Sequence, residues 1–170
     1  MLSYLHAFHA GNFADVQKHS SLALALAMMQ SKTSGIACFD THAGSAIYDL
    51  RSERARKTGE ADYGVQKVWS GRDRLRSGDW KPFLDVLAGF NAGDGELSVY
   101  PGSPVWFRHF LRPADALTFF ELHPSESEQL AGRSLILLTR SNRITLRLLK
   151  LLAKHGRNAV TGFILSGIRY

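Results

Sequence analysis

Two acidic residues stand directly after short apolar runs, at Asp40 and Glu121. Asp40 follows Ile-Ala-Cys-Phe at 36–39 and precedes Thr-His-Ala-Gly at 41–44, whereas Glu121 follows Leu-Thr-Phe-Phe at 117–120. If both runs are parallel strands, the two carboxylates lie at the same edge of a sheet, where the carboxyl ends of strands open into a ligand crevice. Small residues let the backbone approach a ligand there, and carboxylates accept hydrogen bonds from ribose hydroxyls. The pattern therefore favours a nucleotide-like cofactor.

Other chemistries have weaker support. The sequence contains no G-x-x-x-x-G-K-[ST] phosphate loop and no G-x-S-x-G nucleophile motif. His6 and His9 resemble half of a metal site, but no Cys/His cluster continues it, so we expect an ordered arm and no metal. Cys38 is the one cysteine, which excludes an internal disulfide and predicts a buried, inert thiol. Lys18 and His19 are either a solvated pair or contacts to an anionic ligand.

Composition indicates a globular protein with an uneven charge distribution. The 170 residues suit one core with a small inserted lobe, and 45% of them are hydrophobic. No apolar run approaches the roughly 18–20 residues of a membrane span, and the N-terminus lacks a signal-peptide pattern, so we expect no membrane association. Residues 133–170 hold eight Lys/Arg and no Asp/Glu, against 13 Lys/Arg and 15 Asp/Glu in 1–132. The positive charge is thus concentrated in the tail, which favours an anionic partner.

Apolar periodicity predicts an α/β fold. We expect a helix over 13–31 with Asn12 as N-cap and a buried face of Phe13, Val16, Leu22, Leu26 and Met29. We then expect a strand at 36–40, a strand at 97–100, a helix at 105–111 and a strand at 117–122.

Residues 46–95 are helix-like, charged and punctuated by glycine, and they predict a helical insertion. Its expected core is Trp69, Trp80, Phe83, Leu87 and Phe90. The run RSERARK at 51–57 predicts a solvated face, with RNA contact as the alternative. The predicted division is an α/β cofactor-binding core of 1–45 and 96–132, the insertion at 46–95, and a basic tail at 133–170.

Several motifs together resemble those of one protein family. They are MLSYLHAFHAGNFADVQKHS at the start, DTHAG at 40–44, TGE at 58–60, YPGSP at 100–104 and ELHPSE at 121–126. In this order the chain, up to about residue 130, resembles the RlmJ/YhiR family of bacterial S-adenosylmethionine-dependent methyltransferases, which act on an adenine N6 of 23S ribosomal RNA. An older label for relatives concerns the use of external DNA as a nutrient. The resemblance implies a Rossmann-like class I methyltransferase sheet, here partial, with a small helical insertion, in a cytoplasmic monomer that binds 23S rRNA and no metal.

The resemblance also implies roles for individual residues. The implied contacts to S-adenosyl-L-methionine are Lys18 at the carboxylate, His19, His42 from the loop after the first strand, Ser103 at the methionine end and Glu121 at the ribose hydroxyls. Tyr4 is implied to touch the target RNA.

The family's catalytic motif, D-P-P-Y or D-P-S-Y, does not occur in this sequence, so no catalytic residue is assigned. Codons compatible with residues 135–140 include D-P-S-Y-E in a shifted frame. We therefore hypothesise that residues from about 133 onward are an out-of-frame reading that follows a lost segment. The alternative is a genuine strand at 134–138 followed by a cationic amphipathic helix with Ile144, Leu148, Leu151 and Leu152 on one face.

The resulting expectation is a truncated, catalytically impaired rRNA adenine-N6 methyltransferase that binds its cofactor weakly. The alternative function is a non-catalytic nucleic-acid-binding protein that uses the basic tail.

Overall fold

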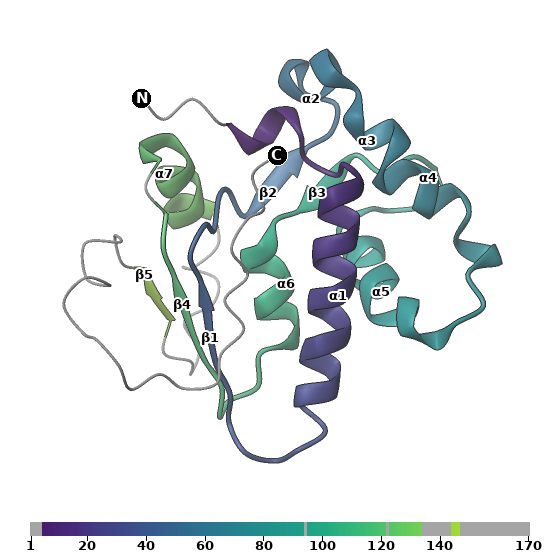
Figure 1. Cartoon of the computed structure of the whole chain (residues 1–170). Coiled ribbons are helices and arrows are strands. Elements are labelled where there is room, and N and C mark those ends of the chain that lie inside the picture. Colours follow the sequence, from purple (N-terminus) through teal and green to yellow (C-terminus); the bar gives the residue numbers. More distant parts are fainter. Residues whose placement is uncertain (1–4, 94, 122, 134–143, 147–170) are drawn as a thin grey trace. The chain divides into compact units, whose positions relative to one another are not determined.

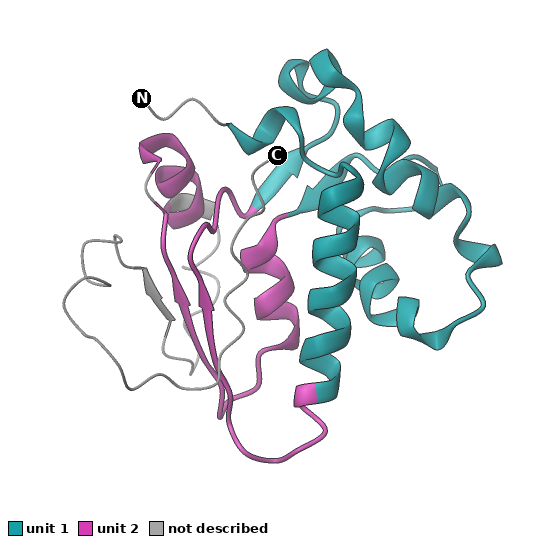
Figure 2. Cartoon of the chain, viewed as in Figure 1, with its two compact units in different colours: residues 1–28, 47–101 teal, residues 29–46, 102–170 magenta. Residues whose placement is uncertain are grey.

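The computed structural model describes residues 5–93, 95–121, 123–133 and 144–146 (Figure 1). The chain forms two compact units, one of residues 1–28 and 47–101 and the other of residues 29–46 and 102–170 (Figure 2). These bounds differ from the predicted division, because the first helix belongs with the segment predicted as an insertion. The cofactor-binding role predicted for 1–45 and 96–132 stays a prediction.

The first unit is mostly helical. Its helices and 3-10 turns are η1 (His6–Phe8), α1 (Phe13–Met29, whose last residue falls in the second unit), α2 (Glu53–Thr58), α3 (Glu60–Tyr63), α4 (Val65–Ser70), η2 (Arg72–Arg74), η3 (Gly78–Trp80) and α5 (Lys81–Phe90). Strands β2 (Ile47–Asp49) and β3 (Val99–Pro101) pair antiparallel, with Tyr48 opposite Tyr100. The strand predicted at 97–100 is therefore present as β3, but it pairs with β2 and not within the parallel sheet.

Helix α1 begins as the sequence predicts. The side-chain oxygen of Asn12 accepts a hydrogen bond from the backbone N–H of Asp15 at 2.9 Å, so Asn12 is the N-cap. Val16, Leu22 and Leu26 are buried as expected, and Met29 is half-buried. The prediction for Phe13 is wrong, since this residue is 72% exposed. Phe13 lies six positions before the buried His19, and at 3.6 residues per turn this places the two side chains about 120° apart around the helix.

A close backbone approach joins the start of α1 to the helices of the predicted insertion. The N–H of Val65 donates to the carbonyl of Gly11 at 2.8 Å. A Cβ on Gly64 would lie 2.2 Å from that same carbonyl oxygen, so the position accepts only glycine without a shift of the backbone. This contact is one of several that join residues 1–28 to 47–101 within one unit.

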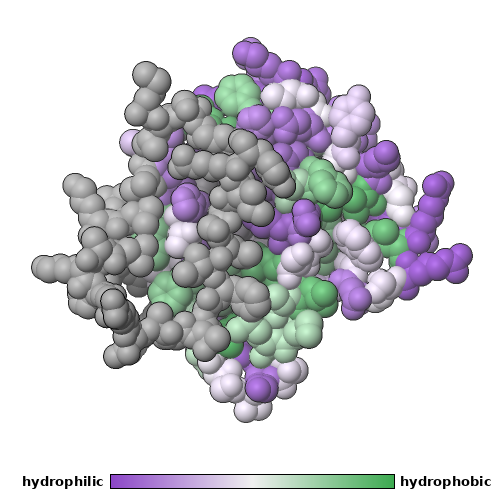
Figure 3. All heavy atoms as spheres, viewed as in Figure 1, coloured by the Kyte–Doolittle hydropathy of each residue, from purple (hydrophilic) through white to green (hydrophobic). Residues whose placement is uncertain are grey.

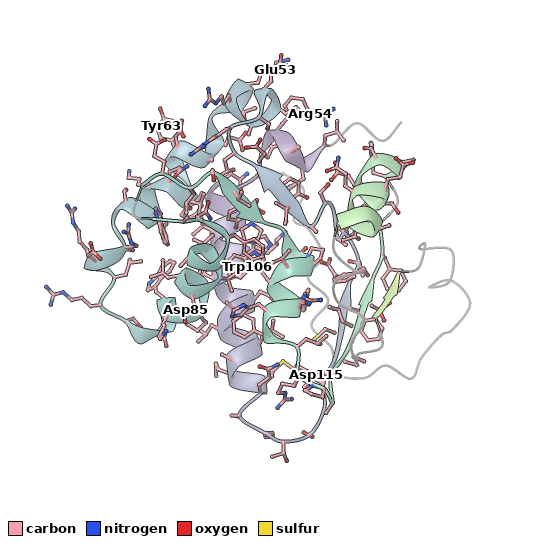
Figure 4. The ribbon with its side chains drawn as sticks, turned by 180° about the vertical axis from the view of Figure 1, so that it is seen from behind. Glu53, Arg54, Tyr63, Asp85, Trp106 and Asp115 are labelled. Carbon is pink, nitrogen blue, oxygen red and sulfur yellow. The ribbon has the colours of Figure 1, made fainter. Side chains whose placement is uncertain are left out.

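The predicted core of the insertion is partly correct. Trp69, Phe83 and Leu87 are buried, whereas Trp80 is half-buried and Phe90, the last residue of α5, is 37% exposed. The run at 51–57 is a solvated face as predicted. Arg51, Glu53, Arg54, Arg56 and Lys57 are all exposed, and Glu53 and Arg54 point away from α2 in Figure 4. The surface around α2 is accordingly hydrophilic (Figure 3).

The second unit contains a small parallel sheet. Its elements are β1 (Ala37–Asp40), α6 (Ser103–Phe110), β4 (Ala116–Phe119), α7 (Pro124–Arg133) and β5 (Ile144–Leu146). The strand order is β1-β4-β5 with all neighbours parallel, and Asp40 lies opposite Phe119. Helix α6 packs against β1 and β4. A mixed α/β fold with a small parallel sheet is thus confirmed.

Two expectations need correction in this unit. The second strand ends at Phe119 and not at 122, so Glu121 lies in the loop that follows β4. Residues 144–146 form β5 and not the start of a cationic helix, while the strand predicted at 134–138 and the remainder of the tail lie outside the described residues. Within the described ranges, no helix has the length and apolar character needed to cross a membrane.

Candidate functional site

The carboxyl ends of β1 and β4 carry the two acids singled out by the sequence. The N–H of Phe120 donates to the carbonyl of Asp40 at 2.8 Å, which extends the parallel pairing one step beyond the strands. The N–H of Ala43 then donates to the carbonyl of Phe120 at 3.1 Å, so the loop after β1 crosses the end of β4. Because the strands are parallel neighbours, Asp40 and Glu121 leave the sheet at the same edge, as predicted.

Glu121 is held by backbone amides on both of its oxygens. Oε2 accepts from the N–H of Gly44 at 2.6 Å, and Oε1 accepts from the N–H of His123 at 2.7 Å. Gly44 has a φ of +61°, a left-handed conformation that favours glycine. A carboxylate offers about four lone-pair positions, so each oxygen retains capacity for a further donor such as a hydroxyl. The carboxylate is therefore oriented before any ligand arrives.

The same loop carries His42 and connects to the start of α6. The imidazole of His42 is exposed and lies 3.0 Å from the hydroxyl of Thr41, while its backbone N–H donates to Oδ1 of the buried Asp40 at 3.2 Å. The carbonyl of Ala46 accepts from the N–H of Gly102 at 2.8 Å, immediately before Ser103, the buried first residue of α6. His42, Ser103 and Glu121 thus lie on segments bonded to one loop.

The other predicted cofactor residues, Lys18 and His19, belong to the first unit. The ammonium of Lys18 lies 3.7 Å from Oδ1 of Asp15. His19 is 1% exposed, and its Nδ1 lies 2.7 Å from the hydroxyl of Tyr100, so the solvated-pair interpretation is wrong for His19. Burial and the nearby charge of Lys18 hold the pKa of His19 well below its usual value, against the opposing effect of Asp15. His19 is therefore neutral at physiological pH. Tyr4 lies outside the described residues.

Asp15 is a buried carboxylate of the first unit. It accepts from the N–H of Gly11 at 2.9 Å and lies 2.7 Å from Nε2 of His6. Burial alone would raise the pKa of Asp15, but His6, with smaller contributions from His19 and Lys18, lowers it well below the usual value. The carboxylate is therefore ionised in the folded protein and fixes the arm that precedes α1.

His9 is bonded to a different acid. Its Nδ1 lies 2.7 Å from Oε1 of Glu60, whose Oε2 accepts from the side-chain amide of Asn12 at 3.0 Å. Burial opposes the shift, but the hydrogen bonds from Asn12 and His9 lower the pKa of Glu60. The two histidines of the arm thus bind separate carboxylates.

Cys38 is half-buried and not fully buried as the sequence predicts. Burial within β1, with a smaller effect of the Asp115 charge, raises the pKa of its thiol to about 11. The thiol is therefore protonated at physiological pH and is a poor nucleophile.

Sequence reasoning missed two polar contacts of the second unit. The hydroxyl of Ser45 donates to Oε2 of the buried Glu126 at 2.5 Å. The guanidinium of Arg112 binds both oxygens of Asp115 and also donates to the carbonyls of Gln30, Lys32 and Ser34. One local signal was available: Glu126 is the third residue of α7, where an acid favours the positive end of the helix.

Comparison with known proteins adds three relatives. The chain is 43% identical over 126 residues to an Escherichia coli K12 protein and 40% identical over 126 residues to a Haemophilus influenzae protein, each named Ribosomal RNA large subunit methyltransferase J. Both matches cover 74% of this chain but 44% of the relative, so the chain spans less than half the length of these curated relatives. The crystal structure of protein LPL1258 from Legionella pneumophila is similar with a TM-score of 0.70 at 34% identity, covering 81% of this chain and 48% of that one.

A family model described as Ribosomal RNA large subunit methyltransferase D, RlmJ, matches residues 33–144. This range includes β1, the loop with His42, Ser103 and Glu121. The chain therefore belongs to the RlmJ family of ribosomal RNA large subunit methyltransferases.

Proposed function

We propose that this chain is the S-adenosylmethionine-binding part of an rRNA methyltransferase that acts on an adenine N6 of 23S ribosomal RNA. The observation that carries the proposal is the orientation of Glu121, whose two oxygens are aligned by backbone amides at the carboxyl end of a parallel strand pair. Ligands of open α/β sheets bind at this edge, which supports a Rossmann-like arrangement. Membership of the RlmJ family and the names of the relatives support the reaction class.

The residues present fit S-adenosylmethionine, which supplies a methyl group on a sulfonium when bound. Glu121 retains lone pairs that accept from ribose hydroxyls. Ala43 has a small side chain and Gly44 has none, so a ligand can approach the backbone closely there. Ser103 lies at the start of α6, next to the end of the same loop, and is proposed to face the methionine end. The roles implied for Lys18, His19 and Tyr4 by the family resemblance stay predictions.

Isothermal titration of the 170-residue chain with S-adenosylmethionine tests the cofactor proposal. We expect saturable binding that falls at least about tenfold in Glu121→Gln, because a charge-assisted hydrogen bond contributes about 1.5–3 kcal/mol. His42→Ala should also weaken binding, since its side chain is exposed on the same loop. Glu128→Gln is the control, an exposed acid on α7 whose replacement should leave the affinity unchanged. No detectable binding by the unaltered chain would refute the proposal.

We propose further that this polypeptide alone does not transfer the methyl group. The sequence lacks the D-P-[PS]-Y motif whose acid and aromatic ring would hold the extruded adenine. Methylation of 23S rRNA by this chain would contradict that part. The out-of-frame hypothesis for residues from about 133 onward is tested by the gene, since the absence of D-P-[PS]-Y in every frame removes it.

A cytoplasmic monomer is the state we propose for the chain. Size-exclusion chromatography with light scattering tests the monomeric state. A measured mass of twice 18.9 kDa or more would contradict it.

The second candidate is a nucleic-acid-binding protein without catalysis. Eight Lys/Arg and no Asp/Glu in 133–170 favour it, because phosphate contacts dominate such binding. RNA affinity that falls steeply with salt and vanishes on deletion of 133–170, in a chain without affinity for S-adenosylmethionine, would favour this candidate over the first.

A further inference from the structure

We propose that Ser45 and Glu126 form a positioning pair, which holds the loop of residues 41–46 in the conformation that orients Glu121. The inference rests on the proposed function, because it assigns these two residues to the support of the same cofactor site. Neither residue belongs to the predicted contacts of that site.

The first step is the position of Ser45. It directly follows Gly44, whose N–H is the donor to Oε2 of Glu121 at 2.6 Å. Ser45 is 2% exposed, and its hydroxyl donates to Oε2 of Glu126 at 2.5 Å. The same oxygen of Ser45 lies 3.2 Å from the side-chain carbonyl of Gln129. The residue next to the glycine donor is therefore fixed from α7, five residues beyond the acceptor Glu121.

The second step concerns the partner of Glu126. An acid at the third position of a helix often accepts from the backbone N–H of the residue just before the helix. That residue is His123, and its N–H instead donates to Glu121 at 2.7 Å. Glu126, 4% exposed, reaches the loop at Ser45. The start of α7 thus supplies one bond to the carboxylate of Glu121 and one to the loop that completes its other bond.

The third step is the geometry of the loop between its fixed points. The N–H of Ala43 donates to Phe120, and the carbonyl of Ala46 accepts from Gly102. Gly44 lies between these points with a positive φ, a conformation it leaves easily in a free loop. The bond from Ser45 to Glu126 restrains the residue that follows Gly44. Its loss should let the N–H of Gly44 rotate away from Glu121 and leave one carboxylate oxygen without its donor.

The test uses the full 170-residue chain with Ser45→Ala, Glu126→Ala and Glu126→Gln. Glu128→Ala is the matched control, an exposed acid two residues away on the same helix. The first readout is amide hydrogen exchange at Gly44, which needs no cofactor. The second is the affinity for S-adenosylmethionine by isothermal titration, measured well below the melting temperature of each variant.

We expect Ser45→Ala and Glu126→Ala to speed exchange at Gly44 and to weaken cofactor binding, each by about tenfold, as loss of an outer supporting partner does in other preorganised sites. Glu126→Gln keeps an oxygen that accepts from the serine hydroxyl, so it should restore most of both properties. Glu128→Ala should change neither. A purely structural role would lower the melting temperature but leave exchange at Gly44 unchanged relative to the rest of the chain.

The outcomes separate this inference from the proposed function. If the unaltered chain does not bind the cofactor, the proposed function fails, but exchange at Gly44 still tests the pair. If the chain binds and both alanine variants keep wild-type exchange at Gly44 and wild-type affinity, the inference is overturned and the proposed function stands.

Discussion

Replacing Asp115 with asparagine should destabilise the second unit more than any exposed ion pair would. The loop that precedes β4 carries Asp115 (Figure 4), and its Oδ1 accepts from the N–H of Ile36 at 2.9 Å and from the guanidinium of Arg112 at 3.0 Å. Oδ2 accepts from the backbone N–H of Arg112 at 2.9 Å, from the Nε–H of the same arginine at 3.0 Å, and from the side-chain amide of Gln30 at 3.1 Å. Asparagine keeps one acceptor oxygen, so at least two donors face an amide nitrogen.

The magnitude follows from that loss. A hydrogen bond to a charged group contributes about 1.5–3 kcal/mol, and removing one partner of a fully buried pair costs about 3–5 kcal/mol. The side chain of Asp115 is 0% exposed, but that of Arg112 is 27% exposed and regains water. We therefore expect a loss of about 2–4 kcal/mol in the free energy of unfolding for Asp115→Asn.

Denaturant unfolding followed by circular dichroism measures this loss. The matched control is Asp85→Asn, which breaks an i,i+4 pair with Lys81 whose side chains are 52% and 74% exposed. An exposed pair of this kind contributes below about 1 kcal/mol. If Asp115→Asn and Asp85→Asn shift the unfolding free energy equally, the argument from burial and donor number is refuted.

The same carboxylate predicts a pH dependence. Burial alone would raise the pKa of Asp115, but hydrogen bonds from Arg112 and the N–H of Ile36 lower it from 3.8 to about 2. Since the pKa is lower in the folded chain, the stabilisation is present above about pH 4 and is lost as the pH falls toward 2. The difference between the unaltered chain and Asp115→Asn should shrink over that interval. A difference that stays constant down to pH 2 would contradict it.

Three further perturbations have matched controls or a direct readout. Gly64→Ala should destabilise the folded chain in thermal or chemical unfolding, because its Cβ would lie 2.2 Å from a backbone oxygen of the loop before α1. Gly89→Ala in α5 meets nothing within 4 Å and should stabilise the folded chain by about 0.5–1 kcal/mol. Tyr100→Phe removes the hydroxyl bonded to the buried histidine of α1 and should cost about 1–3 kcal/mol, while Tyr63→Phe, at an 82% exposed side chain, should cost below about 0.5 kcal/mol. With a pKa of about 11, roughly one Cys38 thiol in a thousand is ionised at pH 8. Alkylation of the thiol should therefore be at least about a hundredfold slower in the folded chain than in the chain unfolded by guanidinium. Equal alkylation rates in the two states would contradict this.

The strand pair and its acids could be predicted from the sequence because the signals are local. Each strand is a short apolar run with an acid after it, and parallel neighbours place these acids at one edge without further information. The strand predicted at 117–122 ends too late, because the apolar Leu122 extends the pattern of Leu117 to Phe120 past the acid. In the structure the ladder stops once Phe120 has bonded to Asp40, and Glu121 turns to accept backbone amides.

The buried polar contacts could not be predicted in the same way. Ser45 and Glu126 are 81 positions apart, as are His19 and Tyr100. No periodicity links such residues, because their contact depends on how the loops and helices close around the sheet. His19 shows the consequence. The sequence predicts that its imidazole is either solvated or in contact with an anionic ligand. In the structure the imidazole is instead hydrogen-bonded to the hydroxyl of Tyr100 in β3.

The bonds of Glu121 determine how its replacement must be interpreted. Glutamine keeps one oxygen, so its amide nitrogen would face the N–H of either Gly44 or His123. A weaker affinity in Glu121→Gln would therefore combine a lost ligand contact with a disturbed loop. His42→Ala separates the two effects, because the side chain of His42 is exposed and contacts Thr41, and its backbone bond to Asp40 is retained. If His42→Ala weakens cofactor binding while exchange at Gly44 stays at the wild-type rate, the loop itself contacts the ligand; if both variants change exchange in proportion to affinity, Glu121 acts through the loop.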